Sequence, residues 1–313
     1  MSVLLVLLLL LAIGVAGLVA YTQRSARWAE RQVPMAGRRV AVPGGAIHLV
    51  EAGPQDAPPV VLIHGLSGQL QHFTYAMVED LARDFRVVAV DRPGCGYSER
   101  AGDDDAALAT QARMIRAALA ELGVARPVLV GHSLGGTVAL AMALDAPEGT
   151  GALALIAPLT RTQEATPAVF RGLEVHTPLM RRVIGHTLAV PLAWRTAERV
   201  LTAVFAPDRV PEDFVTRAGG ALGLRPHAFV AASADLLAVQ RDIGPLSARY
   251  GDLAMPRGVL FGDADALLPP ERHGAAMAEH GFEVELLEGR GHMLPITAPA
   301  ACTAFVRRVA AQV

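Results

Sequence analysis

The stretch that decides the fold is residues 127–136, which read PVLVGHSLGG and precede a run rich in Ala, Leu and Met. Apolar residues typical of a buried strand lead into a Gly-x-Ser-x-Gly pentapeptide centred on Ser133. A serine in a tight strand-to-helix turn presents its hydroxyl at the helix N-terminus, and glycines on both sides let neighbouring backbone pass close by. The stretch therefore predicts a strand, a sharp turn and a helix, with Ser133 as a nucleophile.

Serine at its ordinary pKa is a weak nucleophile, so this hypothesis requires a histidine base and a carboxylate that orients it. Both types of residue follow strand-like runs further along the chain. One apolar run leads into Asp263 and Asp265, and the next leads into His292. Because the carboxyl ends of parallel strands meet at one edge of a sheet, we expect these groups to lie near Ser133.

Short β-branched runs alternate with helix-like stretches from residue 38 onward, which predicts parallel strands joined by crossover helices. The expected strands, a leading hairpin and then buried runs, cover residues 38–42, 46–51, 59–64, 86–90, 128–131, 152–156, 258–261 and 282–287. The expected helices of the sheet domain cover residues 75–84, 106–122, 134–144 and 299–311. The fold class is therefore α/β, with a doubly wound, mostly parallel, eight-stranded sheet.

In its order of serine, acid and histidine, the chain resembles the α/β-hydrolase family over about residues 38–313. The resemblance implies a catalytic triad in which His292 is the base. The acid of that family usually stands three residues after a glycine, which favours Asp265. Asp263 and, after the preceding strand, Glu164 stay open as alternatives.

Residues 62–68 read LIHGLSG and match the His-Gly-x turn of the same family. By resemblance, the backbone N–H groups of Leu66 and Leu134 would stabilise the oxyanion of the reaction, where one such donor is worth about 2.7–4 kcal/mol. His64 is expected to be a structural, hydrogen-bonding residue. Residues 91–98, DRPGCGYS, also resemble a loop of the family that we interpret as scaffold.

The strand signal stops between residues 160 and 256, where Arg-rich amphipathic segments follow one another. We expect a helical cap here, inserted between the core segments 38–159 and 257–313. Most of its apolar residues, such as Leu179 and Leu192, are expected to pack inside the cap. Serine-bearing relatives of the family share nearly identical triads, so the cap should select the substrate, and an apolar cap favours an apolar acyl or alkyl group.

The chain begins with an apolar run, residues 3–20, that contains no charged side chain. As a helix it would reach about 27 Å, close to the roughly 30 Å of a bilayer core. We expect a single-pass transmembrane anchor over residues 1–20 and a basic linker over 21–37. The arginines after the run would leave the catalytic domain in the cytoplasm. A cleaved signal peptide, with an exported domain, is the alternative.

The composition excludes several other classes of protein. A net charge of −2, from 28 basic and 30 acidic residues, provides no positive field for nucleic acid. Every basic residue is Arg, which rules out Schiff-base and P-loop lysine chemistry. Cys95 and Cys302 form no pair at metal-ligand spacing, so we expect neither a zinc site nor another cofactor.

These observations predict a serine hydrolase that cleaves a hydrophobic, lipid-derived or other, carboxylic ester through an acyl-enzyme. An anchored domain with such a cap is similar in plan to membrane-bound esterases and monoacylglycerol lipases. Carbon–carbon bond hydrolases and cofactor-free haloperoxidases resemble the chain in the same triad and stay open, as does a non-catalytic binding protein of this fold. The expected partners are a hydrophobic small-molecule ester and the membrane, not nucleic acid.

Overall fold

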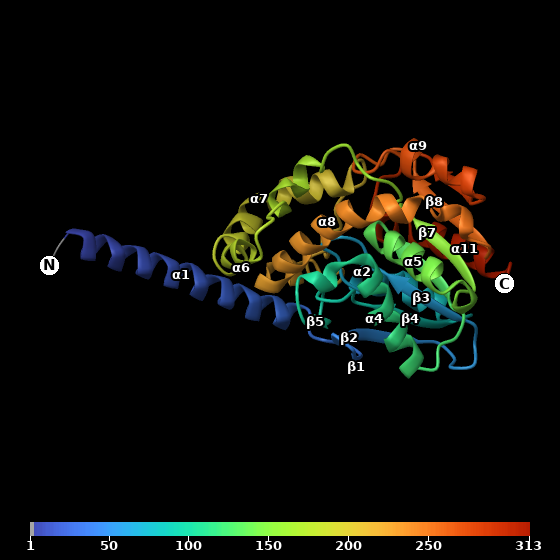
Figure 1. Ribbon diagram of the computed structural model, residues 1–313, viewed down its shortest axis with the longest axis horizontal. Helices are drawn as coiled ribbons and strands as arrows, with labels where there is room; N and C mark the ends of the chain where they lie inside the picture. The colour runs from blue at the N-terminus through green and yellow to red at the C-terminus, as the bar shows by residue number, and fades with distance from the viewer. Residues whose placement is uncertain (1–2) are drawn as a thin grey trace.

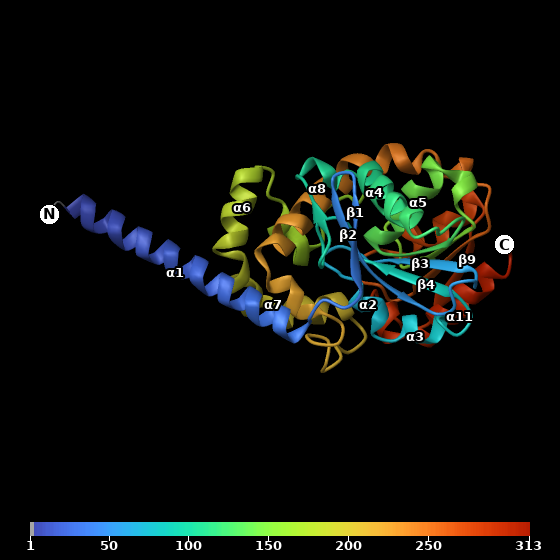
Figure 2. The ribbon, with the colours of Figure 1, turned by 90° about the horizontal axis from the view of Figure 1, so that it is seen from below.

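The computed structural model describes residues 3–313 of the chain. A sheet with helices on both faces forms most of the molecule, and one long helix, α1 (Val3–Gln32), projects from it (Figure 1). Residues 1 and 2, at the start of the predicted anchor, lie outside the described residues. The turned view in Figure 2 shows the N-terminal half of α1 standing clear of the rest of the molecule.

The strands run in the order β1-β2-β4-β3-β6-β7-β8-β9, and the two-residue β5 pairs with β2. Their bounds are β1 (Arg38–Val42), β2 (Gly45–Ala52), β3 (Pro59–Ile63), β4 (Arg86–Val90), β5 (Glu99–Arg100), β6 (Val128–His132), β7 (Ala152–Ile156), β8 (Arg257–Gly262) and β9 (Glu283–Leu287). The pairs that involve β2 are antiparallel, and all pairs from β4 to β9 are parallel. The predicted α/β class and the eight expected strands are confirmed, and β5 is an addition.

Helices cover both faces of the sheet, which explains why its central strands are continuously apolar. Along β3, Val61 and Ile63 pack in the cluster that includes α4 (Leu108–Glu121) and α5 (Leu134–Asp145). Val60 and Leu62 point to the other face, toward α3 (Met77–Leu81) and α11 (Pro299–Ala310). Side chains alternate between the faces of a strand, so both must be apolar where both are covered.

The remaining helices are short or belong to the segment between β7 and β8. They are α2 (Gln71–Thr74), α6 (Pro178–His186), α7 (Ala189–Phe205), α8 (Pro226–Ser247), α9 (Pro270–His273) and α10 (Leu294–Thr297), with 3-10 turns at Asp104–Ala106, Pro147–Gly149, Ala168–Leu173, Gly220–Leu224, Tyr250–Asp252 and Ala275–His280. Of the helix expected over 75–84 only α3 forms, over Met77–Leu81, while α2 lies before that range. Ala76, with a non-helical φ of −154°, separates the two helices.

Helices α6, α7 and α8 form the insertion between β7 and β8, where the sequence predicts a cap. They lie together on the side of the molecule where α1 leaves it (Figure 1). Val204 of α7 and Val239 of α8 line a cavity together with Ser133. The insertion therefore covers the carboxyl edge of the sheet.

The stretch predicted as a basic linker, residues 21–37, is helical as far as Gln32. Helix α1 continues without a break past its apolar half, and from Thr22 onward one side of it packs on the domain. Ala29 and Val33 contact the buried residues Ala221 and Leu222. The arginines of this stretch therefore lie on the outer side of a docked helix.

Candidate active site

Ser133 occupies the turn between β6 and α5, with φ of 54° and ψ of −123°. A positive φ is unfavourable for a residue with a side chain and costs about 1–3 kcal/mol, so the surroundings must hold it. The Ser133 N–H donates to the carbonyl of Ile156 at 3.1 Å, and its own carbonyl accepts from Gly136 at 2.9 Å and from Leu159 at 3.1 Å. These bonds fix the turn predicted from the Gly-x-Ser-x-Gly stretch.

The glycines around Ser133 are explained by close approaches of backbone. A Cβ on Gly131 would lie 2.5 Å from the carbonyl oxygen of Gly135, and a Cβ on Gly135 would overlap the carbonyl of Ile63. A Cβ on Gly65 would lie 2.8 Å from the Cβ of Ser133. The turn after β3 therefore passes directly beside the serine, as the resemblance implies for an oxyanion-binding turn.

His292 and Asp265 follow β9 and β8 and form a buried pair. The Nδ1 atom of His292 lies 2.6 Å from Oδ2 of Asp265. The other carboxylate oxygen accepts N–H bonds from Leu267 at 2.8 Å and Leu268 at 3.0 Å. Because an ionised carboxylate only accepts, Nδ1 carries the ring proton and Nε2 is left as an acceptor.

The other two candidate acids lie elsewhere. Asp263 is exposed and accepts the N–H of Gly289 at 2.7 Å. Glu164 pairs with Arg272 at 3.0 Å, and 88% of its side chain is exposed. Neither of them hydrogen-bonds His292 within residues 3–313, so the geometry favours Asp265 over both alternatives.

Ser133, His292, Leu66 and Leu134 line one cavity of about 70 Å³. The apolar part of its wall consists of Leu159, Pro167, Phe170, Val204, Leu236, Val239, Leu267, Leu268 and Met293. Across residues 3–313 no hydrogen bond joins the Ser133 hydroxyl to His292. Catalytic hydrogen bonds are often long in unliganded sites and shorten when substrate binds, so the geometry is compatible with Ser133 and His292 acting together.

The two leucines whose backbone N–H groups are expected to stabilise the oxyanion both line this cavity. Leu134 is the first residue of α5, and the first N–H groups of a helix have no partner within it. Leu66 follows Gly65, whose backbone lies against Ser133. Both leucines line the cavity on the side of the serine.

A buried arginine, Arg92, holds the turn after β3 through hydrogen bonds that the sequence did not predict. Arg92 donates from Nε to the carbonyl of His64 at 2.9 Å and from Nη2 to that of Gly65 at 3.0 Å. His64 in turn donates from Nδ1 to Gly65 at 2.8 Å and accepts the backbone N–H of Arg92 at 3.0 Å on Nε2. Burial and the nearby guanidinium lower the pKa of His64 well below its usual value, so it stays neutral and structural.

Arg92 is also tied to the helical insertion. Its Nη1 lies 2.6 Å from Oδ2 of Asp235, a buried residue of α8 that also pairs with Arg100. Burial alone would raise the pKa of Asp235, but the two guanidinium groups outweigh it and lower that pKa. The ion pair thus links the turn beside Ser133 to the insertion. Nothing in the sequence marks the pair, because its members are 143 residues apart.

Two further histidines line the cavity of Ser133, and burial keeps both of them neutral. His132 has its pKa lowered well below the usual value by burial and by His292, whose carbonyl lies 3.0 Å from its Nε2. Burial lowers the pKa of His72 to about 4. Only His132 was considered from the sequence, as its neighbour Ser133 suggested.

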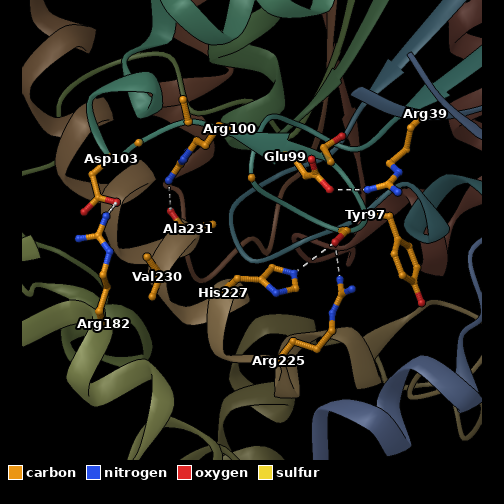
Figure 3. Close-up of a pocket in the computed structure, with 15 residues that line it drawn as sticks. Arg39, Tyr97, Glu99, Arg100, Asp103, Arg182, Arg225, His227, Val230 and Ala231 are labelled. Atoms are coloured by element: carbon orange, nitrogen blue, oxygen red, sulfur yellow. Dashed lines mark hydrogen bonds and ion pairs between the residues drawn. The ribbon is translucent and has the colours of Figure 1, made fainter. Parts of the chain in front are cut away.

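A larger cavity, of about 370 Å³, lies away from Ser133 on the side of β5 (Figure 3). Its cationic lining residues are Arg39, Arg100, Arg182 and Arg225, and burial lowers the pKa of a fifth lining residue, His227, to about 4. Arg39 pairs with Glu99, and Arg182 with Asp103. Since these cations already have partners, the cavity is not a ready anion site.

Comparison with known proteins identifies the family to which the chain belongs. Residues 58–299 match the family model of the alpha/beta hydrolase fold. The chain belongs to the α/β-hydrolase family. The resemblance seen in the sequence is thereby confirmed.

The individual proteins that this hydrolase resembles are distant relatives. The chain is 37% identical over 125 residues to the dihydrolipoyllysine-residue acetyltransferase component of the acetoin cleaving system of Pseudomonas putida, a match that covers 39% of this chain and 32% of that protein. It thus spans only about a third of the curated relative. A membrane phospholipase A, described as a bacterial virulence factor, has a similar structure, with 25% identity, a TM-score of 0.69 and 97% of both chains covered. A thermophilic esterase from Thermogutta terrifontis also has 25% identity and a TM-score of 0.69, over 87% of this chain and 97% of its own.

Proposed function

We propose that this hydrolase cleaves a hydrophobic carboxylic ester with Ser133, His292 and Asp265. The observation that carries the proposal is the buried His292–Asp265 pair at 2.6 Å, which shares a cavity with a serine held at a positive φ. A histidine oriented in this way is a general base for a nearby hydroxyl. The likeness to an esterase and to a phospholipase supports an ester as the substrate class.

The reaction proceeds in two acyl-transfer steps. Nε2 of His292 accepts the proton of Ser133 as Oγ attacks the ester carbonyl, and the N–H groups of Leu66 and Leu134 stabilise the resulting oxyanion. The imidazolium then gives its proton to the leaving alcohol, which leaves an acyl-enzyme. Water attacks the acyl group with the same proton transfers, releasing the acid and restoring Ser133. Asp265 maintains the productive tautomer and stabilises the imidazolium.

The cavity wall supports a hydrophobic acyl or alkyl group. Apart from the histidines, the serine and Gln163, the side chains around Ser133 are apolar. At about 70 Å³ the cavity is well below the roughly 300–1,000 Å³ of typical ligand sites, so a long chain requires α7 or α8 to shift. Helices α6 to α8 therefore act as the cap that selects the substrate.

Helix α1 anchors this enzyme in a membrane, with the catalytic domain on the cytoplasmic side. It is long and apolar enough to cross a bilayer, with a mean hydropathy of 3.1 over a window of which no part is buried, although a signal sequence passes the same test. Continuity supports the anchor: Ala20, where cleavage would fall, lies inside a helix whose later turns pack on the domain. The arginines after Ala20 support the cytoplasmic side.

The test compares the purified full-length chain with its Ser133→Ala variant on p-nitrophenyl esters from acetate to palmitate. Ser247→Ala, on α8 away from the cavity, is the matched control. We expect Ser133→Ala alone to lose both turnover and labelling by a fluorophosphonate, with an unchanged circular dichroism spectrum. Turnover should peak at medium or long acyl chains.

Each other outcome has a definite meaning. Wild-type turnover in Ser133→Ala contradicts the mechanism, and a peak at acetate contradicts the hydrophobic substrate. Serine labelling without ester turnover points to carbon–carbon bond hydrolysis or haloperoxidase chemistry. A chain that is neither labelled nor active is a binding protein with this fold.

A further inference from the structure

Helices α6 and α7 expose apolar side chains, contrary to the expectation that these pack inside the cap. Outside α1, ten large apolar side chains are exposed among the described residues, and six of them belong to these two helices and the turn between them. They are Leu179, Met180, Val183, Leu188, Leu192 and Trp194, here called the α6–α7 face. Leu179 is the most exposed of them, at 71%. A contiguous apolar patch of this kind marks an interaction surface rather than chance exposure.

The α6–α7 face does not arise from poor packing of these helices. On α6, Arg181 and Gly185 are buried, and a Cβ on Gly185 would lie 3.0 Å from the carbonyl of Pro226 at the start of α8. The guanidinium of Arg181 donates to Ser233 of α8 at 3.0 Å. The polar and small side of α6 thus packs inward, and its apolar side points outward, the reverse of an ordinary surface helix.

The face lies beside α1 just past the end of its apolar half. The Thr22 hydroxyl donates to the carbonyl of Thr187, in the turn between α6 and α7, at 3.3 Å. The rings of Trp28 on α1 and Trp194 on α7 are 5.6 Å apart. Figures 1 and 2 both show α6 and α7 next to the point where α1 leaves the domain.

These contacts determine the level of the face relative to a bilayer. If residues 3–20 cross the hydrocarbon core, Thr22 lies about 3 Å beyond its edge, since a helix rises about 1.5 Å per residue. Thr187, bonded to Thr22, lies at the same level. A helix that rests on a membrane buries its apolar side about 5–10 Å deep at the boundary of headgroups and acyl chains, which is where this geometry puts Leu188 and the neighbouring part of the face. Trp194, beside Trp28, lies about 12 Å beyond the edge of the core, on the outer side of the face.

Charge complements the apolar side chains. Arg24 and Arg27 follow the apolar half of α1 and are exposed, and Arg195 and Arg199 are exposed on α7. Cations at this level attract anionic headgroups. Tyr21, 46% exposed, lies at the depth where aromatic residues collect in membrane proteins.

We infer that the α6–α7 face lies in the headgroup boundary of the same bilayer that α1 crosses, an inference that rests on the proposed anchor. Helix α7 begins at this face and ends at the cavity, where Val204 forms part of the wall beside Ser133. The helix that touches lipid therefore also closes the site.

The chain has only two tryptophans, so a single reporter can be placed in the face. Leu188, 48% exposed and next to Thr187, is replaced in a full-length Leu188→Trp variant that also carries Trp28→Phe and Trp194→Phe. This variant is reconstituted in phosphatidylcholine vesicles whose acyl chains carry bromine at a known depth. We expect bromine near the glycerol to quench the reporter at position 188 more strongly than bromine at the chain end. A reporter that is unquenched at every depth overturns the inference.

A second reporter separates failure of the face from failure of the anchor. Leu10→Trp is made in a chain with Trp28→Phe and Trp194→Phe, so that it reports on α1 alone. Quenching of this residue by deep bromine, with the reporter at position 188 unquenched, means that α1 spans the bilayer and the face does not touch it. If the residue at position 10 is unquenched as well, the anchor itself is wrong and the inference falls with it.

Activity provides an independent readout. In the double variant Leu179→Gln, Val183→Gln, the turnover of a long-chain ester embedded in vesicles should fall about tenfold. The turnover of a soluble short-chain ester should be unchanged. The matched control is Leu286→Gln, which changes a side chain that is 49% exposed on β9, away from α1. Equal loss on both esters, or no loss on the embedded one, contradicts the inference. A dimer in detergent that the double variant dissociates, with vesicle turnover intact, would show that the face binds a second copy instead.

Discussion

Replacing Asp265 with Asn is the sharpest test of the proposed site, because the two side chains have the same shape and differ in one hydrogen-bonding group. Oδ1 of Asp265 accepts two backbone N–H bonds, at 2.8 and 3.0 Å, and Oδ2 accepts from His292. An amide has a single accepting atom and an NH₂ group that only donates. One side of the Asp265 environment must therefore lose its acceptor.

The structure indicates which side of the Asp265 environment loses its hydrogen-bond acceptor. Turning the NH₂ group toward Leu267 and Leu268 would leave their buried N–H groups unpaired, at about 1–3 kcal/mol each. Turning it toward His292 lets Nδ1 accept instead and moves the ring proton to Nε2. The second arrangement is favoured, and in it Nε2 cannot accept the Ser133 proton. In a hydrolase whose mechanism is known, the same change lowers kcat about 10⁴-fold, which corresponds to roughly 5.5 kcal/mol of transition-state stabilisation.

The assay is kcat on the best p-nitrophenyl ester at neutral pH, with thermal unfolding as a check on the fold. Asp263→Asn is the matched control, because its exposed carboxylate accepts only the N–H of Gly289 among the described residues, a bond that an amide oxygen also makes. We expect near-wild-type activity from the control. An Asp265→Asn enzyme within about tenfold of wild type would refute the tautomer argument, and a large loss in Asp263→Asn alone would transfer the role to that residue.

Two further predictions concern stability. Asp235→Asn removes the charge between Arg92 and Arg100 and leaves a buried cation uncompensated, so the free energy of unfolding should fall by about 3–5 kcal/mol and kcat should fall as the turn at Gly65 loosens. Asp252→Asn, at a carboxylate that is 66% exposed, is the control, and an equal Tm in both variants would contradict this. Burial lowers the pKa of His72, His227 and His273 from 6.5 to about 4. Between these values the unfolded chain binds protons that the folded one does not, so Tm should fall as the pH drops from about 6.5 to about 4. A Tm that is constant across that window would show that these histidines are not buried in the neutral form.

Much of the catalytic core was predictable because its signals are local. The strand expected over 59–64 is apolar at every position as far as Ile63, which identifies a strand covered on both faces, and the structure confirms this for β3. The Gly-x-Ser-x-Gly stretch determines the turn, since neighbouring backbone excludes any side chain at Gly131 and Gly135. The order of strand ends was enough to predict that Ser133 and His292 share one edge of the sheet.

Other features had no local signal. The helix expected over 75–84 is interrupted at Ala76, a residue that favours helix on its own. Helix α1 docks on the domain through Thr22, Ser25 and Ala29, small residues that form no hydrophobic stripe. Its second half was therefore expected to be a linker.

The sequence by itself determined the α/β class, the serine turn and a short list of partners for Ser133, because strand pattern, glycine spacing and the order of residues along the chain are properties of neighbours. Only the tertiary structure shows that Asp265 is buried beside His292 while Asp263, two residues away, is exposed. It also brought Arg92 to Asp235 and turned the apolar side of α6 outward beside α1. Periodicity shows that a helix has an apolar side, but the direction of that side depends on what the rest of the chain packs against it.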